Sequence, residues 1–153
     1  MRRVDRHPPA PILDEAGLMD DAVEILFCSH DRGLDRDVEH GYERSLSVED
    51  ALREEVFLVY EMSGVPLPPQ HGSPLRLVVP DWYGMASVKW LRQIRALEKP
   101  FEGFQQVLAY HYQKFEEDPG TPVTREHPHA LMIPPGMTGF LCRKRHLKAG
   151  NIT

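Results

Sequence analysis

Cysteine is scarce in this sequence, which contains only Cys28 and Cys142 among its 153 residues. Two cysteines so far apart exclude a disulfide framework, and they do not form the clustered pattern of a zinc site. Such sparse usage is typical of a reducing compartment. Two arginines lie near the start, at positions 2 and 3, but no apolar run of an export signal follows them. We therefore expect a cytoplasmic protein.

Long apolar runs and an excess of positive charge are also missing. No segment approaches the roughly 20 apolar residues of a membrane-spanning helix, so we expect no membrane span. The formal net charge of −5 gives no support to nucleic-acid binding. The sequence also lacks a phosphate-binding glycine loop, a GxSxG turn and a dinucleotide fingerprint. An anionic ligand would therefore depend on a few local basic side chains.

Proline is frequent by contrast, with 14 residues, which argues against a helix bundle. Gly17 is expected to end a first short helix, and Ser47 to cap a second one with Asp50 in the capping-box position. The apolar patterns predict strands between turns. We expect helices at 11–22 and 47–55, strands at 22–28, 56–62, 75–80 and 91–98, and a long polar loop at 29–45.

Three basic residues occur in the proline-rich segment 66–90, which reads PLPPQHGSPLRLVVPDWYGMASVKW. His71 precedes a glycine, Arg76 lies inside the LRLVV run, and Lys89 has apolar neighbours. One interpretation is that Arg76 and Lys89 point to solvent or pair with carboxylates, because a buried charge needs a partner. The other is that loop ends gather these side chains around an anion such as phosphate, for which Arg offers a planar fork and Lys a point charge.

Asp31 and Cys28 lie at the end of the first predicted strand. Asp31 fits a turn aspartate, and it also fits an acceptor for the NH groups of a ligand. Cys28 is expected to be a small buried apolar residue, with a metal-ligand role as the minority interpretation. The histidines form no helical i, i+4 pair and no HExxH motif, so they predict no metal centre.

The stretch YEMSGVPLPPQHGSPLRLVVPDWYGMASVKWL, residues 60–91, resembles the molybdopterin-binding domain of the sulfite oxidase family. In that family a Pro-Leu-Pro turn precedes His-Gly-x-Pro-x-Arg and Val-Lys-Trp. Here Asp81 replaces the glycine that usually follows the proline at position 80. The resemblance implies an α+β fold, a mixed sheet with short helices, truncated at its N-terminal side. Residues 1–120 would form a partial molybdopterin-binding domain. Residues 121–153 would begin an all-β sandwich domain that dimerises, giving a homodimer in the full-length form.

The resemblance also implies that the chain binds molybdopterin, the molybdenum cofactor. The positions that match cofactor-binding residues of the family are Asp31, His71, Arg76, Ser87, Val88 and Lys89. The active-site tyrosine of the family matches Tyr110, with Tyr112 as the other candidate. The family's molybdenum-ligating cysteine lies in a Cys-x-Gly-Asn-Arg segment that this sequence does not contain, so we assign no metal ligand.

Three functions follow from these patterns. The first is an oxidoreductase that transfers an oxygen atom to or from a small oxyanion such as sulfite, with this chain binding the cofactor. The alternative is a truncated, catalytically inactive remnant, because the cysteine segment is missing. A third, independent of the resemblance, is a small α/β module that binds an anionic ligand through Arg76 and Lys89.

Overall fold

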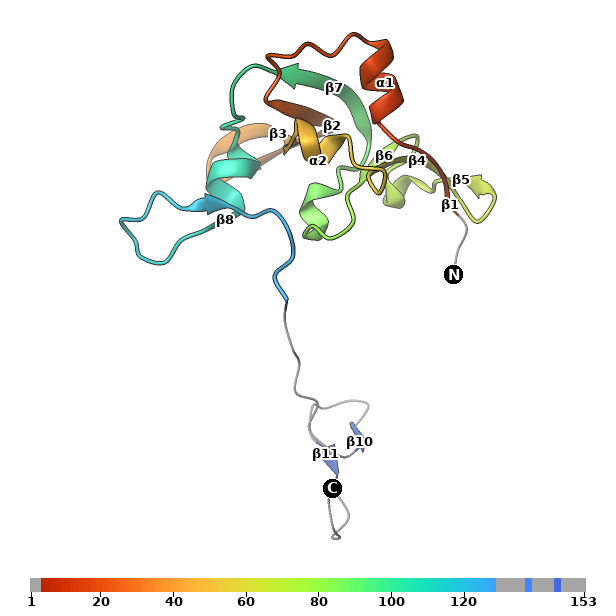
Figure 1. The fold of residues 1–153 in the computed structure, drawn as a ribbon. Coiled ribbons are helices and arrows are strands. Elements are labelled where there is room, and N and C mark those ends of the chain that lie inside the picture. Colours follow the sequence, from red (N-terminus) through yellow and green to blue (C-terminus); the bar gives the residue numbers. More distant parts are fainter. Residues whose placement is uncertain (1–3, 129–136, 139–144, 147–153) are drawn as a thin grey trace.

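The computed structural model describes residues 4–128, 137–138 and 145–146, and most of the described strands form two sheets (Figure 1). One sheet has the order β3-β2-β7; in the other, β4 pairs with β1, β5 and β6. The strands of the sheets are β1 (Val4–His7), β2 (Glu24–Asp35), β3 (Val38–Ser47), β4 (Phe57–Met62), β5 (Val65–Pro66), β6 (Arg76–Val78) and β7 (Leu91–Leu97). Two further short pairs are β8 (His111–Tyr112) with β9 (Thr121–Pro122) and β10 (Met137–Thr138) with β11 (Arg145–His146).

The helices are few and short, as the α+β prediction requires. They are α1 (Ala10–Glu15), α2 (Val48–Ala51), the single turns η1 (Pro69–His71) and η2 (Gly84–Ala86), and the π-helical turn η3 (Gln105–Ala109). Gly17 adopts a left-handed φ of 78° just after α1, as predicted for the residue that ends the helix, so the helix does not extend to residue 22. Ser47 caps α2 as predicted, since its side chain accepts a hydrogen bond from the backbone N–H of Asp50. The α+β class is confirmed, and all the described strand pairs are antiparallel.

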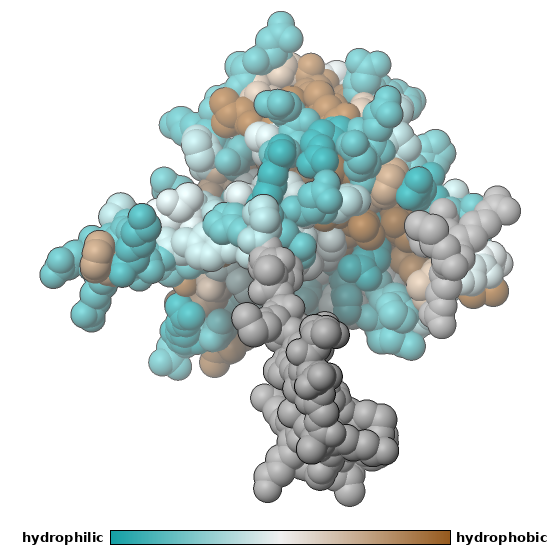
Figure 2. All heavy atoms as spheres, turned by 60° about the horizontal axis from the view of Figure 1, so that its bottom comes forward, coloured by the Kyte–Doolittle hydropathy of each residue, from teal (hydrophilic) through white to brown (hydrophobic). Residues whose placement is uncertain are grey.

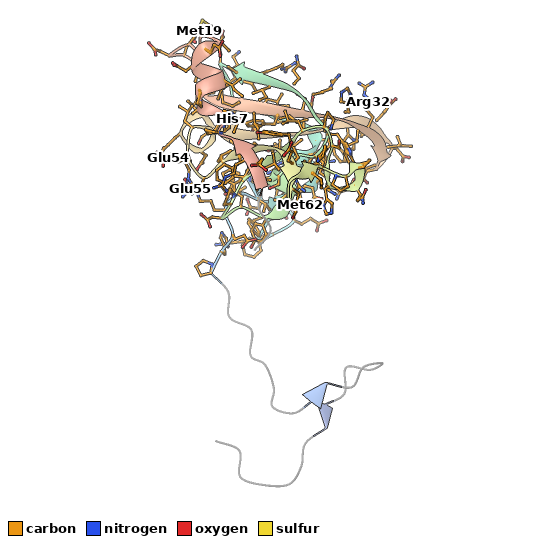
Figure 3. The ribbon with its side chains drawn as sticks, turned by 90° about the vertical axis from the view of Figure 1, so that its right-hand side faces the viewer. His7, Met19, Arg32, Glu54, Glu55 and Met62 are labelled. Atoms are coloured by element: carbon orange, nitrogen blue, oxygen red, sulfur yellow. The ribbon has the colours of Figure 1, made fainter. Side chains whose placement is uncertain are left out.

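The prediction of a polar loop at 29–45 was wrong, because this stretch forms most of the β2–β3 hairpin. The hairpin reverses at Arg36 and Asp37, which both have positive φ, 49° and 61°. Its outer part has solvent on both faces, so the sequence there shows no apolar alternation. In Figure 3, Arg32 marks this hairpin on the opposite side of the view from Glu54 and Glu55.

The core lies between the two sheets and includes Phe27 of β2, Leu58 of β4, Leu77 of β6 and Val88. The predicted strands at 56–62, 75–80 and 91–98 are confirmed as β4, β6 and β7. However, β4 is not buried along its whole length, because Tyr60 is 41% exposed. Figure 2 shows mainly hydrophilic residues on the surface it presents, with separate apolar areas between them.

The segment after residue 120 remains attached to the residues before it. Trp82 and Arg125 form a β-bridge, and Glu126 donates a backbone hydrogen bond to Asp81 O at 2.8 Å. The boundary near residue 120 and the all-β dimerisation domain at 121–153 remain predictions, since most of residues 129–153, including Cys142, lie outside the described residues. Within the described ranges, no helix is long and apolar enough to cross a membrane.

Candidate functional site

The turn at Gly72 brings the three basic residues of segment 66–90 together. Gly72 has a φ of 103°, and a Cβ atom placed there would lie 2.9 Å from Lys89 Cβ and 3.1 Å from Arg76 Cβ. A glycine is therefore needed both for the left-handed backbone and for the close approach of the two side-chain stems. His71 directly precedes this turn, so His71, Arg76 and Lys89 meet at one backbone contact.

Hydrogen bonds to backbone carbonyls of η1 hold the two cationic side chains. Arg76 Nη1 donates to His71 O at 3.1 Å, and Lys89 Nζ donates to Gln70 O at 2.9 Å. Neither Arg76 nor Lys89 has an ion pair within the described part of the chain. The interpretation that they pair with carboxylates is therefore not supported there, and both positive charges are available to an anion.

Arg76 is half-buried, and its Nε atom is buried without a hydrogen-bond partner among the described residues. Burial lowers the pKa of Arg76 from its usual value, because a low-dielectric surrounding disfavours the charged form. An unsatisfied donor on a buried cation is costly unless a ligand completes it. Arg76 therefore carries a buried donor that the described residues leave unsatisfied.

Five of the six predicted cofactor-binding residues, all but Val88, line two cavities. A cavity of about 180 Å³ brings together Asp31, Ser87 and Lys89. Its complete lining is Asp31, Tyr42, Gly84, Ser87, Lys89 and Trp90. His71 and Arg76 line a second, more apolar cavity of about 320 Å³, to which Arg6 also contributes. Lys89 of the first cavity and Arg76 of the second both approach the turn at Gly72 with their side-chain stems.

The strand β2 and the Ser87–Trp90 segment are tied to each other beside Asp31. Ser29 Oγ donates to Lys89 O at 2.7 Å and accepts from the Asp31 N–H at 3.3 Å. The His30 N–H donates to Trp90 O at 2.9 Å. These bonds place the carboxylate of Asp31 on the same cavity as the ammonium of Lys89.

Ser87 and Val88 contribute in different ways. Ser87 Oγ accepts a hydrogen bond from the Val79 N–H at 3.1 Å, yet Ser87 still lines the smaller cavity. The side chain of Val88 is fully buried in the core, and its carbonyl accepts from the Leu77 N–H at 2.8 Å. Val88 lines neither cavity, so its assignment to the cofactor stays a prediction.

Tyr42 is a member of the smaller cavity that the sequence interpretation missed. Its hydroxyl donates to Met85 O at 2.5 Å, which fixes the η2 turn before Ser87. Burial raises the pKa of Tyr42 to about 12, with a further contribution from the charge of Tyr110. Tyr42 therefore stays protonated and keeps its O–H hydrogen bond to Met85 O. Recognising 38–47 as a strand would have identified it, because Tyr42 faces inward on that strand.

Tyr110 directly follows η3 and is 40% exposed. Its carbonyl accepts from the Val123 N–H at 3.0 Å, and the guanidinium carbon of Arg44 lies 6.0 Å from its ring centroid. Tyr112, the other candidate, stacks on His127 at 5.2 Å between ring centroids. The assignment of Tyr110 as the catalytic tyrosine stays a prediction.

The described residues contain no group of three His, Cys, Asp or Glu side chains that could hold a metal ion. Cys28 is 1% exposed, as predicted for a small buried apolar residue. Burial, assisted by a hydrogen bond to Glu43, raises the pKa of the Cys28 thiol to about 11. Cys28 also lines neither cavity.

Most of the chain is similar to known proteins. Residues 7–105 match the family described as "Oxidoreductase molybdopterin binding domain". An uncharacterized oxidoreductase of Bacillus subtilis (strain 168) is 34% identical over 100 residues, covering 65% of this chain and 46% of that protein. The sulfite oxidase of Arabidopsis thaliana is 43% identical over 87 residues, covering 54% of this chain and 21% of that protein.

A solved structure is also similar. The sulfane dehydrogenase SoxCD from Paracoccus pantotrophus superposes with a TM-score of 0.60 at 26% identity, covering 78% of this chain and 29% of that chain. The chain thus spans less than half the length of the curated relatives described above, 46% and 21%.

Proposed function

Because the chain belongs to the oxidoreductase molybdopterin-binding domain family, we propose that Asp31 and the segment 66–90 hold its pterin cofactor. The cofactor of the family is molybdopterin, a heterocycle that carries a phosphate. The observation behind this assignment is the packing of Arg76 and Lys89 against Gly72, with His71 beside them. It places two cations without ion pairs, within the described residues, at one turn.

The residues present fit the pterin and its phosphate. Arg76 and Lys89 supply charge-assisted donors for phosphate oxygens, and the unsatisfied Nε of Arg76 leaves one donor open. Asp31 supplies an acceptor for the NH groups of the heterocycle. His71 and the Ser87 hydroxyl supply further polar contacts at the cavity walls. The cavities thus combine apolar walls with a few directed polar groups, as cofactor sites do.

When bound, the molybdenum of the cofactor supplies oxygen-atom transfer, and the protein orients the reactants. We propose a small oxyanion such as sulfite as the substrate, on the basis of the similarity to a protein named sulfite oxidase. Tyr110 would lie at the substrate side, beside the cation of Arg44. The thiol of Cys28 does not fit a molybdenum ligand, because it is buried and lies outside both cavities. An experiment must therefore distinguish a chain that turns over substrate from one that binds the cofactor without activity.

Cofactor content tests this proposal. The chain is purified from a host that makes the cofactor, and pterin fluorescence and molybdenum are measured per chain. Lys89→Met and Asp31→Asn are each expected to lower the retained pterin, because each removes a charged partner of the ligand. The loss of one charge-assisted hydrogen bond, about 1.5–3 kcal/mol, corresponds to about a 10- to 100-fold loss of affinity.

Matched controls use the same substitutions away from the cavities. Lys99→Met and Asp35→Asn alter exposed residues that line neither cavity and are expected to retain full pterin content. A wild-type chain without any pterin would refute the binding claim. Pterin without sulfite-dependent turnover would support the alternative of a binding chain that lacks activity.

A further inference from the structure

Arg44 of β3 is a buried cation that the cofactor assignment does not use. Arg44 is 1% exposed, and its guanidinium forms no ion pair with a carboxylate among the described residues. Its Nε atom is buried without a hydrogen-bond partner there. Burial lowers the pKa of Arg44, while Tyr42 and Tyr110 act in the opposite direction. A buried charge without a carboxylate is costly, so its retention calls for a specific task.

The guanidinium of Arg44 connects the two segments that flank Tyr110. Nη1 donates to Gln105 O at 2.6 Å, at the start of η3, and Nη2 donates to Val123 O at 2.8 Å. The Val123 N–H in turn donates to the carbonyl of Tyr110 at 3.0 Å. Figure 1 shows η3 and β8 beside the β2–β3 hairpin, which carries Arg44. The guanidinium of Arg44 therefore binds the backbone before Tyr110, at Gln105, and the backbone just after β9, at Val123.

The backbone around Tyr110 has little regular support of its own. η3 is a single π-helical turn, a geometry that is rare and frequent at functional sites. Tyr110 then leaves the turn with φ of −123° and ψ of 79°, and β8 begins at the next residue. The ring of Tyr110 is held near the guanidinium, 6.0 Å from its central carbon. The hydrogen bonds from Arg44 to Gln105 O and Val123 O therefore support the backbone that carries this ring.

We propose that Arg44 is a positioning residue for Tyr110, which it holds in place through the carbonyls of Gln105 and Val123. The importance of this position for turnover rests on the proposed function, in which Tyr110 is at the substrate side. Tyr42 and Arg44 lie two residues apart on β3. The Tyr42 hydroxyl bonds to Met85 O in η2, and Arg44 bonds to Gln105 O in η3. The strand β3 thus sets both the cofactor cavity and the tyrosine beside it.

The test uses the full chain labelled with 3-fluorotyrosine and observed by ¹⁹F NMR. The chain has five tyrosines, and the Tyr110 resonance is assigned by its loss in Tyr110→Phe. In Arg44→Met the apolar stem is kept and the fork is removed. We expect the Tyr110 resonance to move and broaden, while the resonance of Tyr60, on β4 in the other sheet, stays unchanged. Arg44→Lys keeps the charge but not the planar fork, and we expect it to restore the Tyr110 resonance only in part.

A Tyr110 resonance that is identical in wild type and Arg44→Met would overturn the proposal. So would an equal change at Tyr60, because it would indicate general unfolding. If the wild-type chain retains cofactor and turns over sulfite, Arg44→Met is expected to lower kcat by about 100-fold with unchanged pterin content, as misplaced groups do. Absence of pterin in the wild type would refute the proposed function alone, since the resonance of Tyr110 is measured without it.

Discussion

The alanine substitution at Gly72 gives the sharpest test of how segment 66–90 is built. The new Cβ would lie 2.9 Å and 3.0 Å from Lys89 Cβ and Cα, distances that real Cβ atoms avoid. The φ of 103° adds strain, because an L-residue in a left-handed conformation costs roughly 1–2 kcal/mol. Overpacking of this kind costs about 1–3 kcal/mol. The lower entropy of the unfolded alanine chain returns about 0.4–1 kcal/mol.

We therefore expect Gly72→Ala to lower the free energy of unfolding by about 2–4 kcal/mol, the net of strain and overpacking. Two other glycines separate these causes. Gly64 has a φ of 78°, but a Cβ added there would have no atom within 4 Å, so Gly64→Ala carries the strain alone. Gly33 has neither strain nor a close neighbour, so Gly33→Ala is the neutral control.

Urea unfolding followed by tryptophan fluorescence measures all three variants, and Trp90 reports directly, because its backbone N–H donates to Gly72 O at 3.3 Å. The expected order of destabilisation is Gly72→Ala, then Gly64→Ala, then Gly33→Ala. A Gly72→Ala variant no less stable than Gly64→Ala would refute the close packing of Lys89 and Arg76 at this turn. The folded Gly72→Ala chain is also expected to retain less pterin.

Two further predictions concern residues outside the cavities. In a Cys142→Ser background at pH 8, Cys28 is expected to resist iodoacetamide in the folded chain and to react after unfolding in urea; fast reaction of the folded chain would contradict its burial. The folded Cys28 thiol has a pKa of about 11 against the ordinary 9.0, so it keeps its proton at higher pH than the unfolded thiol does. The free energy of unfolding should therefore fall as the pH rises from 9.0 to about 11. Cys28→Ala should weaken that fall. Ser47→Ala removes the cap of α2 and should cost about 1 kcal/mol in thermal or urea unfolding, whereas an unchanged stability would show that the cap is dispensable.

Much of the fold was predictable where local chemistry decides structure. The apolar runs of β4 and β6 and the cap at Ser47 are all properties of short windows. The stop at Gly17 was predictable for the same reason, since its left-handed φ of 78° follows from its position after the helix. Arg76 and Lys89 both pack against Gly72 and form no ion pair within the described residues, while their binding to an anion stays a prediction.

The β2–β3 hairpin was not predictable by the same means. It turns at Arg36 and Asp37 rather than at an Asn-Gly or Asp-Gly pair, and its outer part is solvated on both faces. A polar strand of this kind has the composition of a loop. Missing it also hid Tyr42 and Arg44, whose partners lie 43 to 79 residues away in the chain. Contacts at that separation leave no signal in a short window.

The crystal structure of the cofactor-loaded chain is the measurement that tests the central claim most directly. We expect electron density for one pterin, with its phosphate oxygens within hydrogen-bond distance of the Arg76 guanidinium and Lys89 Nζ and its NH groups at the Asp31 carboxylate. A pterin bound elsewhere, with Arg76 and Lys89 still bonded only to the carbonyls of His71 and Gln70, would contradict the account.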